Sequence, residues 1–458
     1  MDKVTDITLP EGALTLYYDE IGKENKESGL MYSIIEEGKE RTVVLCKSCV
    51  WLKTMYIPSS VKYISKGMLR LCTRLEYIEV HKDNTKYYSE DGILYNKAKS
   101  ILIKCPERID INYFIIKSTV RKIEKFAFIG CRSIKELYAP KQLGERLVGI
   151  TLTLDNLEAV HVDKHNHMFS SFQGILMNKI QSRVLACPRQ KSGAIDIPDT
   201  VVEISSYAFY MCKNITQVTI PEGVQTIGTY AFADIPLITE ITMPSTLKKL
   251  EKEPFAYMWG LKKVVFKSIP IRKSESFHSE FQASANIEEI VLPEGGEMLL
   301  IIFFFHKNIK TITFGNRRFH SRIPFDIDKL INRLSMIPQK TADPVHLLIS
   351  KHCYDADGDD KLTAIAAAYD FIFDKNENAE KYIQNNLAKV LCLLCMTDNA
   401  ELLREVLKRT TDRLSENEKS QVIDAAINNT QNGGSAEVQI IVMNALSDST
   451  SLFDSLTL

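Results

Sequence analysis

Two pairs of cysteines stand at the Cys-x-x-Cys spacing that zinc sites and dithiol redox centres use. They are Cys46 with Cys49 and Cys392 with Cys395. The second pair lies in an apolar stretch that is typical of a buried helix, where thiols pack as small apolar side chains. Most of the ten cysteines instead recur at fixed positions of a repeat, namely Cys49, Cys72, Cys131 and Cys212 at one position and Cys105 and Cys187 at another. The pattern favours structural cysteines, and we expect neither a metal nor a cofactor.

Two further segments carry groups that could hold a cation. His161, His165 and His167 lie close together in the sequence, but no cysteine or carboxylate joins them at a metal-site spacing. The segment 355–362, DADGDDKL, begins like a calcium loop with acids at its first, third and fifth positions. Its glycine comes two positions early, and Ala366 stands where a calcium loop needs a bidentate glutamate. We interpret these segments as surface histidines and as an acidic turn that begins a helix.

Composition and charge exclude several classes of protein. The 458 residues are 45% apolar and 25% charged, and their net charge is −1. This balance is typical of a folded globular protein and lacks the one-signed charge of proteins that bind nucleic acid or anionic membranes. The longest apolar run, MLLIIFFF (298–305), is too short to span the roughly 30 Å of a bilayer core. No phosphate-binding glycine loop, nucleophile elbow or zinc-protease helix occurs, so we predict that the protein is not an enzyme.

The dominant feature of the chain is a repeated phrase. IPDTVVEISSYAFYMCKNITQVTIP (197–221) is followed by IPEGVQTIGTYAFADIPLITEITMP (220–244). Units that open on such an apolar residue, usually with proline, begin at Ile34, Ile57, Ile116, Ala139, Ile197, Ile220, Met243, Phe266 and Leu292. Most steps are 23 residues, and the same positions stay apolar from unit to unit. Two longer units, 80–106 and 162–188, share Asn, Gly, Cys and Pro at matching positions, and their pattern predicts an inserted β-hairpin.

A fixed period of this length with an apolar core predicts a leucine-rich repeat solenoid, in which each coil adds one short strand to a parallel sheet. One coil buries side chains worth about 10–15 kcal/mol, whereas ordering its residues costs roughly 35 kcal/mol, so coils must stack to fold. We expect an α/β repeat protein with a right-handed solenoid over 1–315. Helical patterns follow it, and we expect a linker with the first helices at 316–345 and an α-helical domain at 346–458.

The unit consensus, apolar-Pro-x-x-Val-x-x-Ile-x-x-x-Ala-Phe-x-x-Cys-x-x-Leu-x-x-Val-x-Ile, resembles that of the BspA-like leucine-rich repeat family. The resemblance covers roughly residues 4–315 and includes the hairpin units that close with Cys-Pro. It implies a non-enzymatic protein that binds proteins or glycans at surfaces and acts in adhesion, and many members are exported. Because the N-terminus lacks the apolar core of a secretory signal, we expect a cytoplasmic protein. The alternative is a cell-surface or secreted adhesin whose export signal is not in this sequence.

The exposed face of the predicted sheet is the candidate binding site. Within each strand, the residues between the inward apolar ones face outward together. Near the N-terminal end these positions are aromatic or charged, as binding surfaces often are. The candidates are Tyr56, Tyr77, Glu79, Glu136, Tyr138 and His161. Tyrosine also favours strands for packing reasons alone, so ordinary strand-face residues remain the alternative. We expect a protein partner or a glycan on this face, and neither nucleic acid nor a membrane span.

Overall fold

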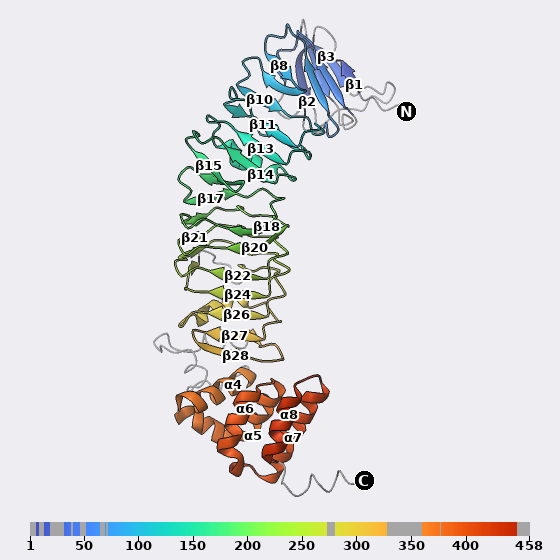
Figure 1. The fold of residues 1–458 in the computed structure, drawn as a ribbon. Coiled ribbons are helices and arrows are strands. Elements are labelled where there is room, and N and C mark those ends of the chain that lie inside the picture. Colours follow the sequence, from blue (N-terminus) through green and yellow to red (C-terminus); the bar gives the residue numbers. More distant parts are fainter. Residues whose placement is uncertain are drawn as a thin grey trace. The chain divides into compact units, whose positions relative to one another are not determined.

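The structure, a computed structural model, describes residues 6–8, 13–18, 32–37, 40–45, 52–64, 69, 72–272, 280–327, 360–375 and 377–446. These residues form a solenoid of short parallel strands followed by helices (Figure 1), as the repeat predicts. The chain divides into two compact units. The first holds residues 1–194, 198–216 and 227–235, and the second holds 195–197, 217–226 and 236–458.

Two parallel sheets of the first unit carry the short strands of successive coils. One consists of β1 (Asp6–Thr8), β5 (Thr54–Ile57) and β7 (Tyr77–Val80), and the other of β11 (Tyr113–Ile115), β13 (Glu136–Ala139) and β14 (Ala159–Val162). In the second sheet Phe114, Leu137 and Val160 stand in register and are buried, whereas their neighbours along each strand are more exposed. The alternation places one face of the sheet in the core of the coil and leaves the other outside.

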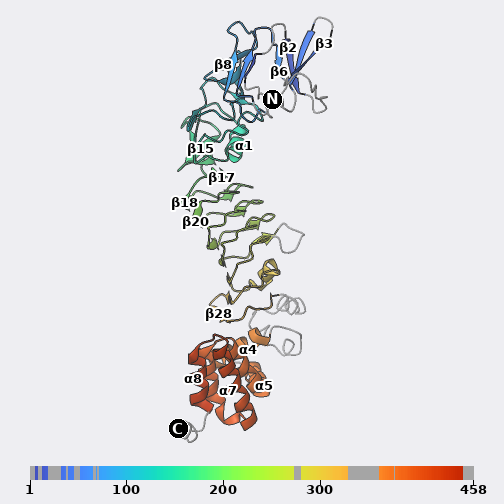
Figure 2. The same ribbon diagram turned by 90° about the vertical axis from the view of Figure 1, so that its right-hand side faces the viewer.

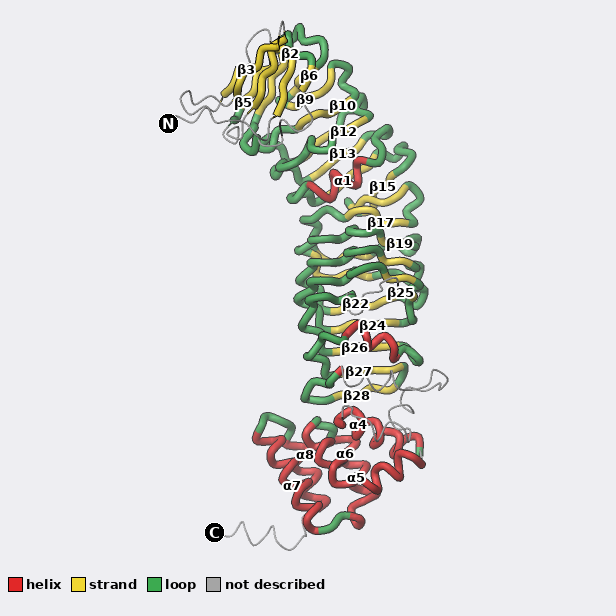
Figure 3. Tube along the Cα trace, turned by 180° about the vertical axis from the view of Figure 1, so that it is seen from behind, coloured by secondary structure: helices red, strands yellow, loops and turns green. Residues whose placement is uncertain are grey.

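Both longer units form the hairpins that their sequences predict. In the first, β8 (Tyr87–Glu90), β9 (Ile93–Asn96) and β10 (Ile101–Lys104) are antiparallel, and β10 pairs in parallel with β12 (Lys122–Ile123). In the second, β15 (Phe169–Phe172), β16 (Ile175–Asn178) and β17 (Arg183–Ala186) repeat this arrangement beside β19 (Glu203–Ile204). A further sheet takes the order β3 (Tyr32–Glu37), β4 (Glu40–Leu45), β2 (Ala13–Tyr18) and β6 (Tyr63–Ile64). The helix α1 (Arg146–Thr153) lies among the strands and loops of this unit (Figure 3).

The asparagine shared by the two hairpin units joins each of them to the preceding coil. Asn166 is buried, and its Nδ2 donates to the carbonyl oxygens of Pro140 and Leu143 at 3.1 and 3.0 Å. Its Oδ1 accepts the backbone N–H groups of Met168 and Phe169, both at 2.9 Å. In the other hairpin unit, Asn84 makes the same four bonds to Pro58, Val61, Lys86 and Tyr87. Each amide therefore satisfies four backbone groups where the 23-residue period is interrupted.

Replacing Asn166 by alanine is expected to lower the free energy of unfolding by about 2–4 kcal/mol, because buried backbone groups lose their partners. Urea denaturation followed by circular dichroism measures the loss. Asn156→Ala is the matched control, since the amide of Asn156 is exposed and donates one bond, to the carbonyl oxygen of Arg132. Equal losses in the two variants would contradict the role assigned to Asn166.

Phenylalanine rings fill the coils of the first unit, but they do not form one continuous column. Phe209 and Phe232 stack with their ring centroids 5.0 Å apart and their planes 7° apart, as their shared repeat position predicts. Phe128, which stands at the same repeat position, instead meets Phe114 edge-on at 5.0 Å. The reason is that the coil after Phe128 carries buried Thr151 at the ring position, so the column has no next member.

The second unit has a five-stranded sheet in the order β22 (Glu240–Met243), β24 (Lys263–Phe266), β26 (Glu289–Leu292), β27 (Thr311–Phe314) and β28 (Arg317–His320). The last strand turns back antiparallel, so the sheet extends past residue 315 into the stretch expected to be linker. β23 (Lys249–Leu250) pairs with β25 (Ile271–Arg272), and β18 (Gly193–Asp196), β20 (Ile215–Thr219) and β21 (Thr226–Ile227) contain residues of both units. The 3₁₀ helix Glu297–Phe303 contains most of the apolar run, whose Leu300 and Phe303 are buried in the coil.

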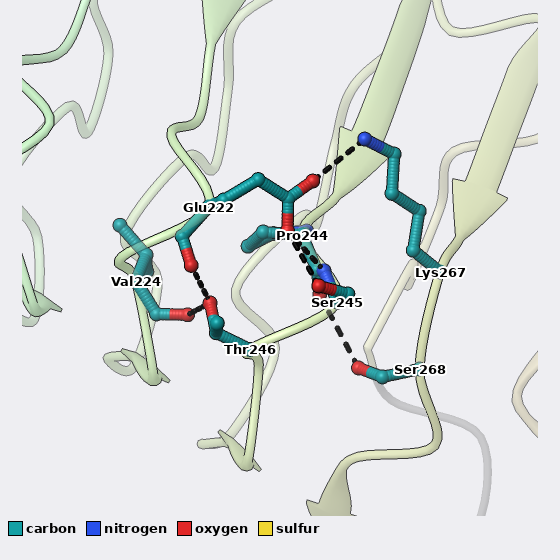
Figure 4. Close-up of polar contacts among 7 residues, drawn as sticks. All are labelled: Glu222, Val224, Pro244, Ser245, Thr246, Lys267 and Ser268. Carbon is teal, nitrogen blue, oxygen red and sulfur yellow. Dashed lines mark hydrogen bonds and ion pairs between the residues drawn. The ribbon is translucent and has the colours of Figure 1, made fainter.

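Polar side chains also join neighbouring coils of the second unit (Figure 4). Glu222 Oε2 accepts the backbone N–H and the hydroxyl of Ser245 at 2.8 and 2.7 Å, and Lys267 Nζ lies 2.7 Å from the other carboxylate oxygen. Thr246 donates its hydroxyl to the carbonyl oxygen of Val224 at 2.8 Å. The ammonium of Lys267 and the donors of Ser245 lower the pKa of Glu222 to about 2, so the carboxylate stays charged and links three coils at ordinary pH.

The C-terminal helices belong to the second unit and pack together after β28 (Figure 2). They are α4 (Asp360–Tyr369), a π-helical turn (Asp370–Asp374), α5 (Glu377–Met396), α6 (Ala400–Thr410), a 3₁₀ turn (Thr411–Arg413), α7 (Glu416–Gln431) and α8 (Ala436–Leu446). A capping box begins α7, with Ser415 Oγ and the Glu418 side chain each bonded to the other's backbone N–H. Arg322, just after the sheet, donates to Asn429 Oδ1 at 3.0 Å and to the Asn432 carbonyl oxygen at 2.7 Å.

Candidate binding face of the parallel sheet

The six candidate residues lie on the two parallel sheets of the first unit. Thr54 and Tyr56 of β5 stand beside Tyr77 and Glu79 of β7, and Glu136 and Tyr138 of β13 stand beside Ala159 and His161 of β14. None of the six candidates is buried, whereas the intervening Met55, Ile78, Leu137 and Val160 are. The structure thus brings Tyr56, Tyr77 and Glu79 together on one sheet, and Glu136, Tyr138 and His161 together on the other.

Glu136, Tyr138 and His161 form a connected group on the second sheet. Tyr138 donates its hydroxyl to Glu136 Oε2 at 2.7 Å, and His161 Nε2 lies 3.2 Å from the same oxygen. The rings of Tyr138 and His161 stack with centroids 4.5 Å apart. The hydrogen bond to Glu136 raises the pKa of the Tyr138 phenol, which therefore stays neutral. The carboxylate orients the Tyr138 ring, on which the His161 ring stacks, and the group lies on an open sheet face, which suits binding through preformed contacts.

Two exposed residues of the same sheet were missed by the sequence analysis. Tyr113 and Ile115 of β11 are 63% and 62% exposed, and they stand in register with Glu136 and Tyr138. They were overlooked because β11 follows a hairpin unit. That unit is longer than 23 residues, so the outward positions after it do not lie at the usual distance from its first residue. Counting backward finds them, since they stand three and one residues before Ile116, as outward residues do in regular units. Tyr113, Ile115, Tyr138 and His161 are called the β11–β14 patch below.

Tyr77, in contrast, packs against the hairpin turn. Gly92 of that turn has a φ of +78°, and a Cβ placed on it would lie 2.7 Å from Cδ2 of Tyr77. Gly174, its counterpart in the second hairpin unit, stands in the same way against Ala159. The shared glycine therefore allows each hairpin turn to approach the neighbouring strand, and it gives Tyr77 a packing role.

His161 belongs both to this patch and to the histidine segment considered for a metal ion. Among the described residues, no three His, Cys, Asp or Glu side chains are grouped so that they could hold a metal ion. Burial raises the pKa of the Cys395 thiol to about 12, so this residue of α5 is a protonated packing group. Cys46, Cys49 and 355–359 lie outside the described residues. In the described part of the chain, no helix has both the length and the apolar character needed to cross a bilayer.

The repeats also match a known family. The description "BspA type Leucine rich repeat region" fits six copies, over residues 44–105, 99–147 and 178–298. The repeats of this chain belong to the BspA-type leucine-rich repeat family. The matched residues include both hairpin units at least in part, and they include β11 and β13 of the patch. Proteins of this kind are non-enzymatic repeat proteins that bind other proteins.

Solved structures of bacterial leucine-rich repeat proteins are similar to the chain. One from Eubacterium ventriosum is 19% identical with a TM-score of 0.42, and the match covers 57% of this chain and 66% of that one, just under two thirds of its length. A leucine-rich cell surface protein from Faecalibacterium prausnitzii is 15% identical with a TM-score of 0.38, over 68% and 90% of the two chains. The pneumococcal vaccine antigen PcpA is 15% identical with a TM-score of 0.32, over 69% and 93%. No curated protein matches the chain.

Proposed function

We propose that this chain is a non-enzymatic binding protein that holds a protein partner on the β11–β14 patch. The observation that carries the proposal is the set of exposed side chains at neighbouring positions of three strands, with Ile115, Tyr138 and His161 in one row across the sheet. Parallel sheets usually have both faces covered, so an exposed aromatic row on one of them is a surface that a partner can cover.

The chemistry of the patch favours a protein partner. Aromatic side chains supply much of the binding energy at protein interfaces because they bury a large area and lose little conformational freedom. Tyr138 and His161 are stacked, and Tyr138 is hydrogen-bonded to Glu136, before any partner arrives, which lowers the entropy cost of binding. Tyr56, Tyr77 and Glu79 are proposed to extend the same binding face along the preceding coils.

Affinity capture from a native lysate tests the patch with the double variant Tyr113→Ala/Tyr138→Ala. We expect it to retain less than one tenth of the partner that the unchanged chain captures, since two central aromatic residues each contribute about 2 kcal/mol or more. Tyr257→Ala is the matched control, because that tyrosine is 40% exposed but lies in the second unit. Capture of the same protein in the same amount by both variants would remove the patch as the binding site.

The place of action distinguishes two forms of this proposal. A scaffold would work in the cytoplasm, whereas the alternative is an adhesin that presents the same face to a host protein or glycan at the cell surface. Protease treatment of intact cells distinguishes the scaffold from the adhesin, because only a protein at the cell surface is cleaved while the cells remain intact.

A further inference from the structure

A cavity of about 290 Å³ lies in the first unit, away from the β11–β14 patch. Residues of β6, β8, β9 and β10 line it. Its apolar wall includes Ile64, Leu69, Ile101, Ile103 and Phe126. Exposed Lys62 and Lys86 line it as well, together with the ring of Tyr87. An apolar wall with a few polar groups at one side is typical of small-molecule sites.

The second hairpin unit serves as an internal reference for this cavity, because residues 57–106 and 139–188 match at a constant shift of 82 positions. Ile101 corresponds to Arg183, which is paired with Glu203 at 2.7 Å. Of the two hairpin units, only the first therefore has an apolar side chain at this position. Tyr87 corresponds to Phe169, which lacks a hydroxyl. Lys62 and Lys86 correspond to Gly144 and Met168. The features that make the cavity amphipathic are therefore not required to build a hairpin unit.

The charges around the cavity leave an excess of positive charge at its rim. Glu124, the acid that lines it, is paired with Lys122 at 2.8 Å. Lys104 also lines it, but its ammonium is directed to Glu107 and to the Ile129 carbonyl oxygen, at 3.5 and 3.3 Å. Within the residues that the structure describes, neither Lys62 nor Lys86 forms an ion pair. Among the described residues, these two ammonium groups stand beside an apolar wall without a carboxylate partner.

The hydroxyl of Tyr87 adds a hydrogen-bond donor. Its oxygen accepts the backbone N–H of Ile64 at 2.8 Å, which leaves the hydroxyl proton free to be donated to a further acceptor. Burial raises the pKa of Tyr87, so the group remains a neutral donor at physiological pH. An anionic oxygen at the rim would meet this donor and the two lysines, while an alkyl or aryl body would lie against the isoleucines.

We propose that this cavity binds a small amphipathic carboxylate, with its apolar body against Ile101 and Ile103 and its head group at Lys62, Lys86 and the Tyr87 hydroxyl. The site is separate from the proposed partner-binding patch, so either can be disproved without the other.

Calorimetric titration of the full chain with octanoate, 1-octanol and octylamine tests the proposal. We expect saturable binding of one octanoate per chain, with at least tenfold weaker binding of octanol and none of octylamine. The charge-reversed variant Lys62→Glu/Lys86→Glu is expected to lose at least tenfold in octanoate affinity. Lys141→Glu/Lys164→Glu is the matched control, because it makes the same charge change at exposed lysines elsewhere in the first unit.

A second variant, Ile103→Trp, fills the cavity and is expected to abolish octanoate binding, with thermal unfolding used to confirm that it is folded. The proposal is overturned if octanoate does not bind saturably, if octanol or octylamine binds as tightly, or if the control pair loses as much affinity as the rim pair. Unchanged binding by folded Ile103→Trp overturns it as well.

Discussion

Replacing Phe281 by alanine is expected to lower the stability of the second unit by about 3–5 kcal/mol, the range for removing a buried phenylalanine ring. Phe281 is fully buried and stands between Phe255 and Phe303, with ring centroids 5.1 and 5.3 Å away. It also meets Phe266 of β24 edge-on at 6.5 Å. Because coils of a solenoid are stabilised by their neighbours, a cavity in the middle of the column weakens the coil on each side.

Hydrogen exchange at the backbone amides of β24 and β26 measures this loss as a fall in the opening free energy. Phe281→Leu is the control, and it should cost about 1 kcal/mol because it keeps most of the apolar volume. The β8–β10 hairpin of the first unit should exchange at its original rate in both variants. A loss below about 1 kcal/mol for Phe281→Ala would mean that the column is not a main source of stability.

Replacing Lys104 by alanine is expected to destabilise the first unit by about 3–5 kcal/mol at neutral pH, because it leaves the carboxylate of Glu107 buried without its cation. Both residues are buried, and Lys104 Nζ lies 3.5 Å from Glu107 Oε1. The double variant Lys104→Ala/Glu107→Gln is expected to recover most of the loss. The matched position in the second hairpin unit supports this, since it holds a fully buried alanine, Ala186.

The same pair predicts a pH dependence. Burial raises the pKa of Glu107 above its ordinary value, and Lys104 opposes this rise. A carboxyl whose pKa is raised by folding costs nothing below its unfolded pKa, and its cost grows as the pH rises through the folded pKa. Lys104→Ala should therefore be much less destabilised at pH 4 than at pH 7 in urea denaturation. A loss that does not change with pH would show that packing of the lysine stem, not the buried charge, accounts for it.

The repeated positions of this protein were predictable because the same residue type recurs at each of them in many units of one chain. The apolar positions of the units and the short parallel strand of each coil occur where the phrase places them. Two copies of Asn, Gly, Cys and Pro were enough to reveal the hairpin units, since Asn84 and Asn166 make the same four bonds. Ser415 and Glu418 stand at the spacing of a capping box, so the start of α7 is a feature that local sequence can indicate.

Departures from the repeat were harder to read. Thr151 stands where other coils have an aromatic ring, and Phe128 packs edge-on against Phe114. The outward positions Tyr113 and Ile115 follow a hairpin unit that is longer than 23 residues, so they could not be located by counting residues from the start of that unit. The bonds from Arg322 to Asn429 and Asn432 join residues more than 100 positions apart. No local sequence pattern predicts pairs of residues so far apart in the chain.

The amino-acid sequence by itself determined the coil, its period, its inward side chains and the family of the repeats, because each depends on neighbours at a constant spacing along the chain. Only the tertiary structure decided which outward side chains meet across strands, as Tyr138, His161 and Glu136 do, and where the coils leave a cavity between Ile64 and Ile103. The physical reason is that stacking in register is repeated in every coil, whereas side-chain contacts and packing gaps depend on the shape of particular residues brought together from separate coils.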